Sequence, residues 1–169
     1  MMGLHKLPPH MKPYQPATLI ATYMLAGLIK PASGTWGSLA ALPLGLYTAY
    51  LFGSTGLLVL AAIGYGLGHW AADKWISGAE DKDPSPIVID EAVGLWLAMT
   101  PLAMLQAPFS LAGIALAFAL FRLFDILKPW PVSWADKKLG GATGIMLDDV
   151  LAGIWAALLL AALGIYGVI

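Results

Sequence analysis

Two pairs of adjacent acidic residues are the part of this sequence whose type and spacing best suit chemistry. Asp90-Glu91 and Asp148-Asp149 each follow three apolar residues. Carboxylates in such apolar surroundings are costly and usually face a bundle interior or a wet cavity. Oxygen ligands of this kind suit Mg²⁺, so both pairs are candidate metal ligands. The alternative is that acids at the start of a helix only complement the helix dipole.

Each acidic pair is followed by a glycine on the same predicted helix. Gly94 comes four residues after Asp90, and Gly153 comes four residues after Asp149. A small residue one turn along a helix lets a neighbouring helix approach closely. The repeated pattern therefore predicts close helix packing beside both pairs of carboxylates.

A third cluster combines a carboxylate with two cations. Arg122, Asp125 and Lys128 recur at intervals of three, so they are expected to share one helix face. The carboxylate could hold a metal ion while the cations neutralise a phosphate group. The alternative is a salt-bridged helix end whose Arg122 reaches towards the membrane interface.

A glycine-punctuated segment near residue 36 is a candidate anion site. Gly34, Thr35, Gly37 and Ser38 precede a predicted helix. Backbone N–H groups at glycines and at a helix N-terminus can approach a phosphate. The alternative is an ordinary turn in which Ser38 caps the helix.

The elements that must position these residues are apolar helices. The 169-residue chain is 59% hydrophobic and only 11% charged, with a mean hydropathy of +0.77. A soluble domain carries roughly 25% charged residues, so part of the surface is expected to face lipid. The absence of cysteine excludes thiolate metal sites and cysteine nucleophiles.

We predict an all-α membrane protein in a single domain over residues 1–169, with a cytoplasmic tail at 1–16. An interfacial or re-entrant helix is expected at 17–29, followed by about five short transmembrane helices. The predicted spans cover 38–52, 57–72, 87–105, 111–127 and 148–166.

The charges are distributed asymmetrically over this topology. The predicted loops at 73–86 and 128–147 are polar, whereas the turns at 53–56 and 106–110 carry no charge. If the N-terminus is inside, all Lys and Arg residues lie on the cytoplasmic side, as the positive-inside rule requires. The acidic residues fall on the same side, which predicts a chemical site at that face.

Four motifs in this order resemble the phosphatidylglycerophosphatase A family, membrane phosphatases of bacterial phosphatidylglycerol synthesis. The resemblance spans residues 31–153, and Asp136 stands where the family tends to have an aspartate. The matching motifs are Gly34-Thr35-Trp36-Gly37-Ser38-Leu39, Ile87-Val88-Ile89-Asp90-Glu91 with Gly94, Phe121-Arg122 with Asp125, Lys128, Pro129 and Pro131, and Gly144-Ile145-Met146 with Asp148, Asp149, Ala152 and Gly153.

The resemblance implies a Mg²⁺-dependent hydrolysis of phosphatidylglycerophosphate to phosphatidylglycerol and phosphate, at the cytoplasmic face of the bacterial inner membrane. Membrane lipid and this substrate are the expected partners, with no nucleic acid and no indication of oligomeric state. The implied metal ligands are Asp90, Glu91, Asp125, Asp148 and Asp149, which with Lys128 form the catalytic set. The implied substrate-binding residues are Gly34, Thr35, Gly37, Ser38, Arg122 and Lys128.

The main alternative from another class is an ion-coupled transporter that uses the clustered acids as a cation site. The predicted spans carry no charged group at mid-membrane or on the far side, where a cation path would need polar groups. A lipid-headgroup transferase is a second alternative, but its dense run of aspartates within one segment is missing.

Overall fold

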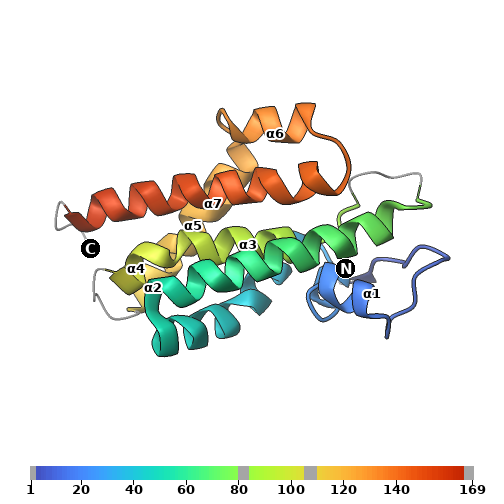
Figure 1. Ribbon diagram of the computed structural model, residues 1–169, viewed down its shortest axis with the longest axis horizontal. Helices are drawn as coiled ribbons and strands as arrows, with labels where there is room; N and C mark the ends of the chain where they lie inside the picture. Colours follow the sequence, from blue (N-terminus) through green and yellow to red (C-terminus); the bar gives the residue numbers. More distant parts are fainter. Residues whose placement is uncertain (1–2, 80–83, 105–109, 166–169) are drawn as a thin grey trace.

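The computed structural model describes residues 3–79, 84–104 and 110–165, and most of this part of the chain is helical (Figure 1). The predicted all-α class is therefore confirmed. The helices are α1 (Pro16–Ala21), α2 (Ser33–Ile76), α3 (Ile89–Ala98), α4 (Thr100–Met104), α5 (Leu111–Leu127), α6 (Val132–Lys138) and α7 (Gly141–Ile165). Near the N-terminus, the strands β1 (Gly3–Leu4) and β2 (Ile29–Lys30) pair antiparallel.

Helix α2 is a hairpin of two arms, residues 33–52 and 54–76. Gly53 breaks the helix with φ 61° and ψ −153°, a conformation that glycine adopts far more easily than other residues. The chain reverses direction there (Figure 1). Trp96 of α3 lies against Gly45 of the first arm and Gly64 of the second, so both arms pack on α3. The helix–turn–helix predicted for 38–72 is confirmed, although its first helix begins five residues earlier, at Ser33.

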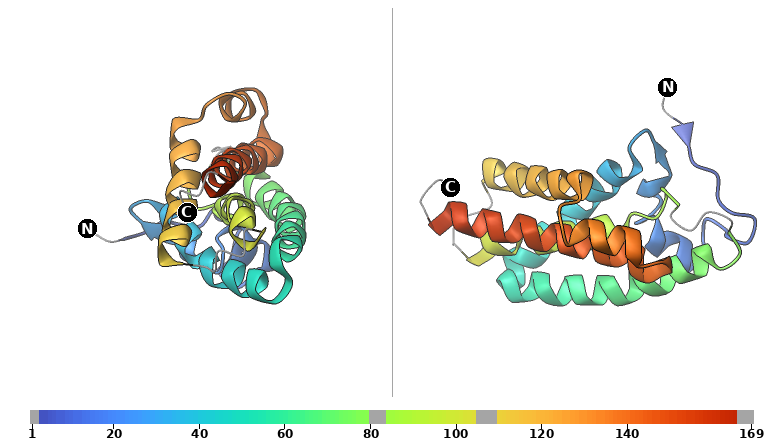
Figure 2. Two further views of the ribbon diagram at one scale, coloured as in Figure 1. Left: turned by 90° about the vertical axis from the view of Figure 1, so that its left-hand side faces the viewer. Right: turned by 90° about the horizontal axis from the view of Figure 1, so that it is seen from above.

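Helix α3 is the core of the bundle. Most of its residues are buried, and the end-on view places α3 amid α2, α5 and α7 (Figure 2). A Cβ on Gly153 of α7 would collide with the backbone of Gly94 on α3, so the two helices touch at their glycines. The close packing predicted from Gly94 and Gly153 is therefore confirmed.

The prediction of about five transmembrane helices is not supported. Within the described residues, two helices are long and apolar enough to cross a membrane, α2 and α7. Helix α3 has ten residues, or about 15 Å, and α5 has 17, or about 26 Å, against a hydrocarbon core of roughly 30 Å. An apolar run signals burial in either protein or lipid, and α3 is buried in protein.

Other predicted boundaries also change. The helix expected at 17–29 ends at Ala21, because Tyr23, Met24 and Leu25 have positive φ. The loop expected at 128–147 contains α6 and the first two turns of α7. The turn expected at 106–110 lies, except for Ser110, outside the described residues.

The two ends of the bundle differ. The reversal between the arms of α2, together with α4 and the end of α7, lies at the left of Figure 1. The N-terminal segment, α1 and the starts of α3 and α7 lie towards the right. Both acidic pairs belong to those helix starts, so the fold brings them to the same end of the molecule.

Candidate active site

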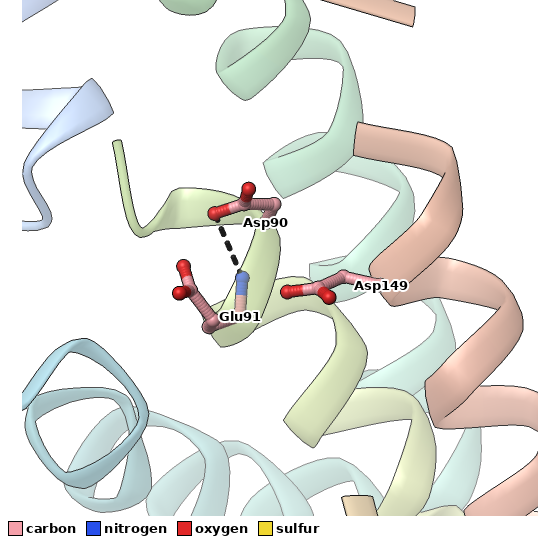
Figure 3. A group of neighbouring side chains, drawn as sticks. All are labelled: Asp90, Glu91 and Asp149. Atoms are coloured by element: carbon pink, nitrogen blue, oxygen red, sulfur yellow. Dashed lines mark hydrogen bonds between the residues drawn. The ribbon is translucent and has the colours of Figure 1, made fainter. Parts of the chain in front are cut away.

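Three carboxylates from α3 and α7 converge where these two helices pack together. Asp90 and Glu91 lie in the first turn of α3, and Asp149 lies two turns into α7 (Figure 3). One ligand oxygen from each lies within 4.8 Å of the others. Asp90 is 9% exposed and Asp149 is 4% exposed. We refer to Asp90, Glu91 and Asp149 as the carboxylate triad.

Helix packing fixes the distance between the two halves of the triad. A Cβ on Gly94 would lie 2.6 Å from the carbonyl oxygen of Asp149 and would overlap the ring of Phe121. Gly94 therefore allows the backbone that carries Asp149 to rest directly on α3. The two glycines therefore allow α3 and α7 to touch, and this contact brings Asp149 close to Asp90 and Glu91.

Glu91 lies between the start of α2 and Arg122 of α5. A Cβ on Gly34, in the first turn of α2, would overlap Glu91 Oε1 and would lie 3.0 Å from Arg122 Nη1. Arg122 Nη1 lies 4.0 Å from Glu91 Oε1. Glu91 Oε2 is buried and has no hydrogen-bond partner among the described residues. This carboxylate oxygen is the strongest sign of an additional positive ligand, because a buried unpaired oxygen is costly.

Arg122 and Asp125 extend the triad along α5. Arg122 Nη1 forms an ion pair at 2.8 Å with Asp125 Oδ2, as predicted from their spacing. The contact does not have hydrogen-bond geometry, and Nη1 has no hydrogen-bond partner among the described residues. A guanidinium carries five N–H donors, so Arg122 can also bind an anion beside Asp125. Asp125 also interacts electrostatically with Asp149. One cation and four carboxylates therefore share this part of the bundle.

Lys128 belongs to a second, adjacent group. Its Nζ donates to Asp148 Oδ2 at 2.9 Å and also to Asp136 Oδ1. Burial by itself would lower the pKa of Lys128, but the hydrogen bonds and charges of Asp136 and Asp148 outweigh it and raise the pKa above its ordinary value. Lys128 is therefore a permanent cation that ties the end of α5 to α6 and α7.

The position of Lys128 differs from the helix face that its spacing predicted. Helix α5 ends at Leu127, and Lys128 adopts φ 44° and ψ 57°. Pro129 follows, and the residue before a proline is disfavoured in helical conformation. Lys128 consequently lies outside the helix, and its partners are Asp136 and Asp148, whereas Arg122 pairs with Asp125. Its partner Asp136 lies eight residues on, across a chain reversal that no helical periodicity could indicate.

Of the glycine-punctuated segment, one residue contacts the site and three have structural contacts. Gly34 contacts Glu91 and Arg122, as described above. The other three residues lie inside α2: the Thr35 N–H donates to the Ala32 carbonyl, Ser38 Oγ donates to the Gly34 carbonyl at 2.8 Å, and a Cβ on Gly37 would collide with Val88. Ser38 is fully buried. The described contacts of Thr35, Gly37 and Ser38 hold the start of α2 and do not reach the triad.

The triad has the composition of a site for a hard metal ion. It offers carboxylate oxygens alone, and Mg²⁺ is bound by one or two carboxylates together with water and phosphate oxygens. Asp90 Oδ1 accepts the Glu91 N–H at 3.0 Å, as acids at a helix start can do without any metal. The dipole alternative explains this contact, but it does not explain the buried and unpaired Glu91 Oε2. The residues therefore fit a bound cation.

Fold and site together define an all-helical protein with long apolar helices and a buried acidic centre flanked by Arg122 and Lys128. This class of site can bind a metal ion and an anionic group side by side.

Comparison with known proteins identifies the family. Residues 19–164 match the family model of phosphatidylglycerophosphatase A. The chain therefore belongs to the phosphatidylglycerophosphatase A family, and it is an enzyme, a phosphoric monoester hydrolase. The resemblance seen in the four sequence motifs is confirmed.

Individual relatives agree. A Haemophilus influenzae phosphatidylglycerophosphatase A is 41% identical over 148 residues, 88% of each chain. An Escherichia coli phosphatidylglycerophosphatase A is 33% identical over 147 residues, 87% of this chain and 83% of the relative. A Bacteroides thetaiotaomicron protein with the provisional name phosphatidylinositol-3-phosphatase is 39% identical over 150 residues, 85% of this chain and 90% of the relative. No solved structure gives a significant match.

Proposed function

We propose that this protein hydrolyses phosphatidylglycerophosphate to phosphatidylglycerol and inorganic phosphate, with Mg²⁺ bound by the carboxylate triad. The observation that carries the proposal is the convergence of Asp90, Glu91 and Asp149 within 4.8 Å, next to Arg122, in a member of this family. In the reaction, water adds to phosphorus and the P–O bond to the headgroup breaks. The proton released by water neutralises the departing alkoxide.

Each side chain has a separate part in this proposal. Asp90, Glu91 and Asp149 hold the metal ion, and Asp125 and Asp148 surround it with further negative charge. Magnesium, when bound there, polarises the phosphate. The guanidinium of Arg122, beyond its ion pair with Asp125, and the remaining N–H donor of Lys128 bind phosphate oxygens and offset the charge that develops on them. Gly34 leaves the space in which Glu91 and Arg122 lie side by side.

The surface supports a location in a membrane. An apolar 18-residue stretch of α2 is only 17% buried within the protein. The exposed residues of α2 include Tyr47, Tyr50, Phe52, Leu58 and Ile63. Large apolar side chains exposed along one helix fit a lipid environment. We place the acidic end at the cytoplasmic face of the inner membrane, because the positively charged segments accompany it. A lipid phosphate lies at that depth.

The proposal is tested by phosphate release from the detergent-purified protein. The substrates are phosphatidylglycerophosphate and phosphatidylinositol 3-phosphate, each with Mg²⁺ or with EDTA. Phosphate release from the first lipid that requires Mg²⁺ supports the proposal. No release from phosphatidylglycerophosphate with any divalent metal, by protein that elutes as a single folded species, would overturn it.

An ion-coupled transporter is not favoured. Family membership makes the chain a phosphatase, and the acids gather beside the starts of α3 and α7 instead of following a path through the bundle. Flux of a cation through proteoliposomes without phosphatase activity would be needed to revive this alternative.

A further inference from the structure

A cavity between α6 and α7 adjoins the site and has no part in the chemistry described so far. Its volume is about 210 Å³. The lining residues are Asp136, Leu139, Gly140, Gly141, Gly144, Ile145 and Asp148. Asp148 connects the cavity to the triad, because its Oδ1 accepts the backbone N–H of Asp149 at 3.0 Å.

The size of the cavity limits its ligand to a small group. Pockets for drug-sized ligands start at roughly 300 Å³, and a water molecule takes about 30 Å³ of liquid volume. The cavity is too small for an acyl chain and large enough for a three-carbon alcohol. It also lies at the acidic end of the molecule, where a lipid headgroup would be.

The chemistry of the lining selects a hydroxyl group. Asp136 and Asp148 present carboxylate oxygens, each of which can accept more than one hydrogen bond. Lys128 uses one oxygen of each carboxylate and fixes both in place. The first backbone N–H groups of α7, starting at Gly141, have no acceptor within the helix. A hydroxyl can donate to the carboxylates and accept from such an N–H, whereas a phosphate oxygen would meet repulsion from both carboxylates.

We propose that this cavity is the subsite for the hydroxylated headgroup, and that Asp136 and Asp148 recognise the free hydroxyl of the glycerol that carries the reacting phosphate. This inference rests on the proposed function. It makes Asp136 a residue that sets substrate specificity, in addition to its contact with Lys128. The phosphate then lies beside the triad and Arg122, and the glycerol extends past Asp148 towards α6.

Gly140 offers a way to fill the cavity. It lines the cavity, and a Cβ built on it meets no atom within 4 Å. Its φ lies outside the left-handed region, so a larger residue can adopt its backbone conformation. Gly66 on the second arm of α2 has the same open surroundings and is exposed, far along the sequence from the cavity. Gly140→Val and Gly66→Val are therefore a matched pair.

The experiment compares phosphatidylglycerophosphate with its analogue that lacks the free headgroup hydroxyl, using the full-length protein in detergent with Mg²⁺. We expect the wild type and Gly66→Val to prefer the hydroxylated lipid at least about 10-fold in kcat/KM, because a site built to bind a hydroxyl rejects the analogue without it. Gly140→Val should lose most of this preference, mainly through a higher KM for the hydroxylated lipid.

The outcomes separate the two proposals. Equal kcat/KM for the two lipids in the wild type would overturn the headgroup subsite while leaving the phosphatase function intact, and this measurement needs no variant. An unchanged preference in folded Gly140→Val would overturn it as well. Absence of hydrolysis of both lipids by the wild type would instead contradict the proposed function.

Discussion

The two acidic pairs look alike in sequence and differ in structure. Asp90 and Glu91 occupy the first turn of α3, and both join the triad. Asp148 and Asp149 lie two turns into α7 and point to different partners: Asp149 joins the triad, whereas Asp148 binds Lys128. Neighbouring residues on a helix project about 100° apart, so the elements that surround each helix decide whether both members of a pair reach the same partners. The second pair thereby links the triad to the cavity lined by Asp136 and Asp148.

The largest expected effect comes from the triad. Asp149→Asn should lower kcat by at least about 100-fold, because it removes a buried carboxylate that we propose as a metal ligand. Titration of Mn²⁺ followed by electron paramagnetic resonance should show weaker binding as well. Asp73→Asn, an exposed aspartate on the second arm of α2, is the control and should retain activity. If Asp149→Asn binds Mn²⁺ as tightly as the wild type, Asp149 is not a metal ligand.

The contact between Gly94 of α3 and Gly153 of α7, which lies beside the two acidic pairs, is tested by measuring stability. Gly153→Ala places a Cβ against the backbone of Gly94, which cannot move aside as a side chain can. We expect the free energy of unfolding in mixed detergent micelles to fall by about 1–3 kcal/mol. The control Gly66→Ala adds a methyl group in open space and should be neutral or stabilising by up to about 1 kcal/mol. Equal stability of the two variants would show that α3 and α7 lie farther apart.

Asp148 should be less important than Asp149. Asp148→Asn keeps the shape of the side chain but weakens its hold on Lys128, so we expect kcat/KM to fall about 10-fold. Affinity for Mn²⁺ should remain close to that of the wild type. A loss of Mn²⁺ binding equal to that of Asp149→Asn would mean that both members of the second pair bind metal, and the proposed division between them would be wrong.

The smallest effect concerns pH. The raised pKa of Lys128 means that its stabilising contribution is fully present below the ordinary lysine pKa of about 10.4 and is lost only as pH rises through the higher folded value. The difference in thermal midpoint between the wild type and Lys128→Met should therefore stay constant from pH 7 to pH 10. Lys138→Met, at an exposed position of α6, is the control. A difference that shrinks between pH 7 and pH 9 would contradict the permanent charge.

Much of the site could be predicted from local patterns. The two pairs, their glycines and the Arg122–Asp125 contact all depend on residues a few positions apart, where helical periodicity determines which side chains are neighbours. The predicted number of spans was wrong for a related reason. Hydropathy records how apolar a segment is, and α3 is as apolar as a transmembrane helix because the other helices surround it.

By itself, the sequence determined the helical class, the reversal at Gly53, the acidic residues and the family. Tertiary structure decided how these residues are shared: which acids form the triad, why Asp148 and Asp136 both bind Lys128, and where a cavity remains beside them. The physical reason is range. Helix formation and glycine conformation depend on nearby residues, whereas the contacts among α3, α5, α6 and α7 join segments far apart in the chain and arise only when the helices pack.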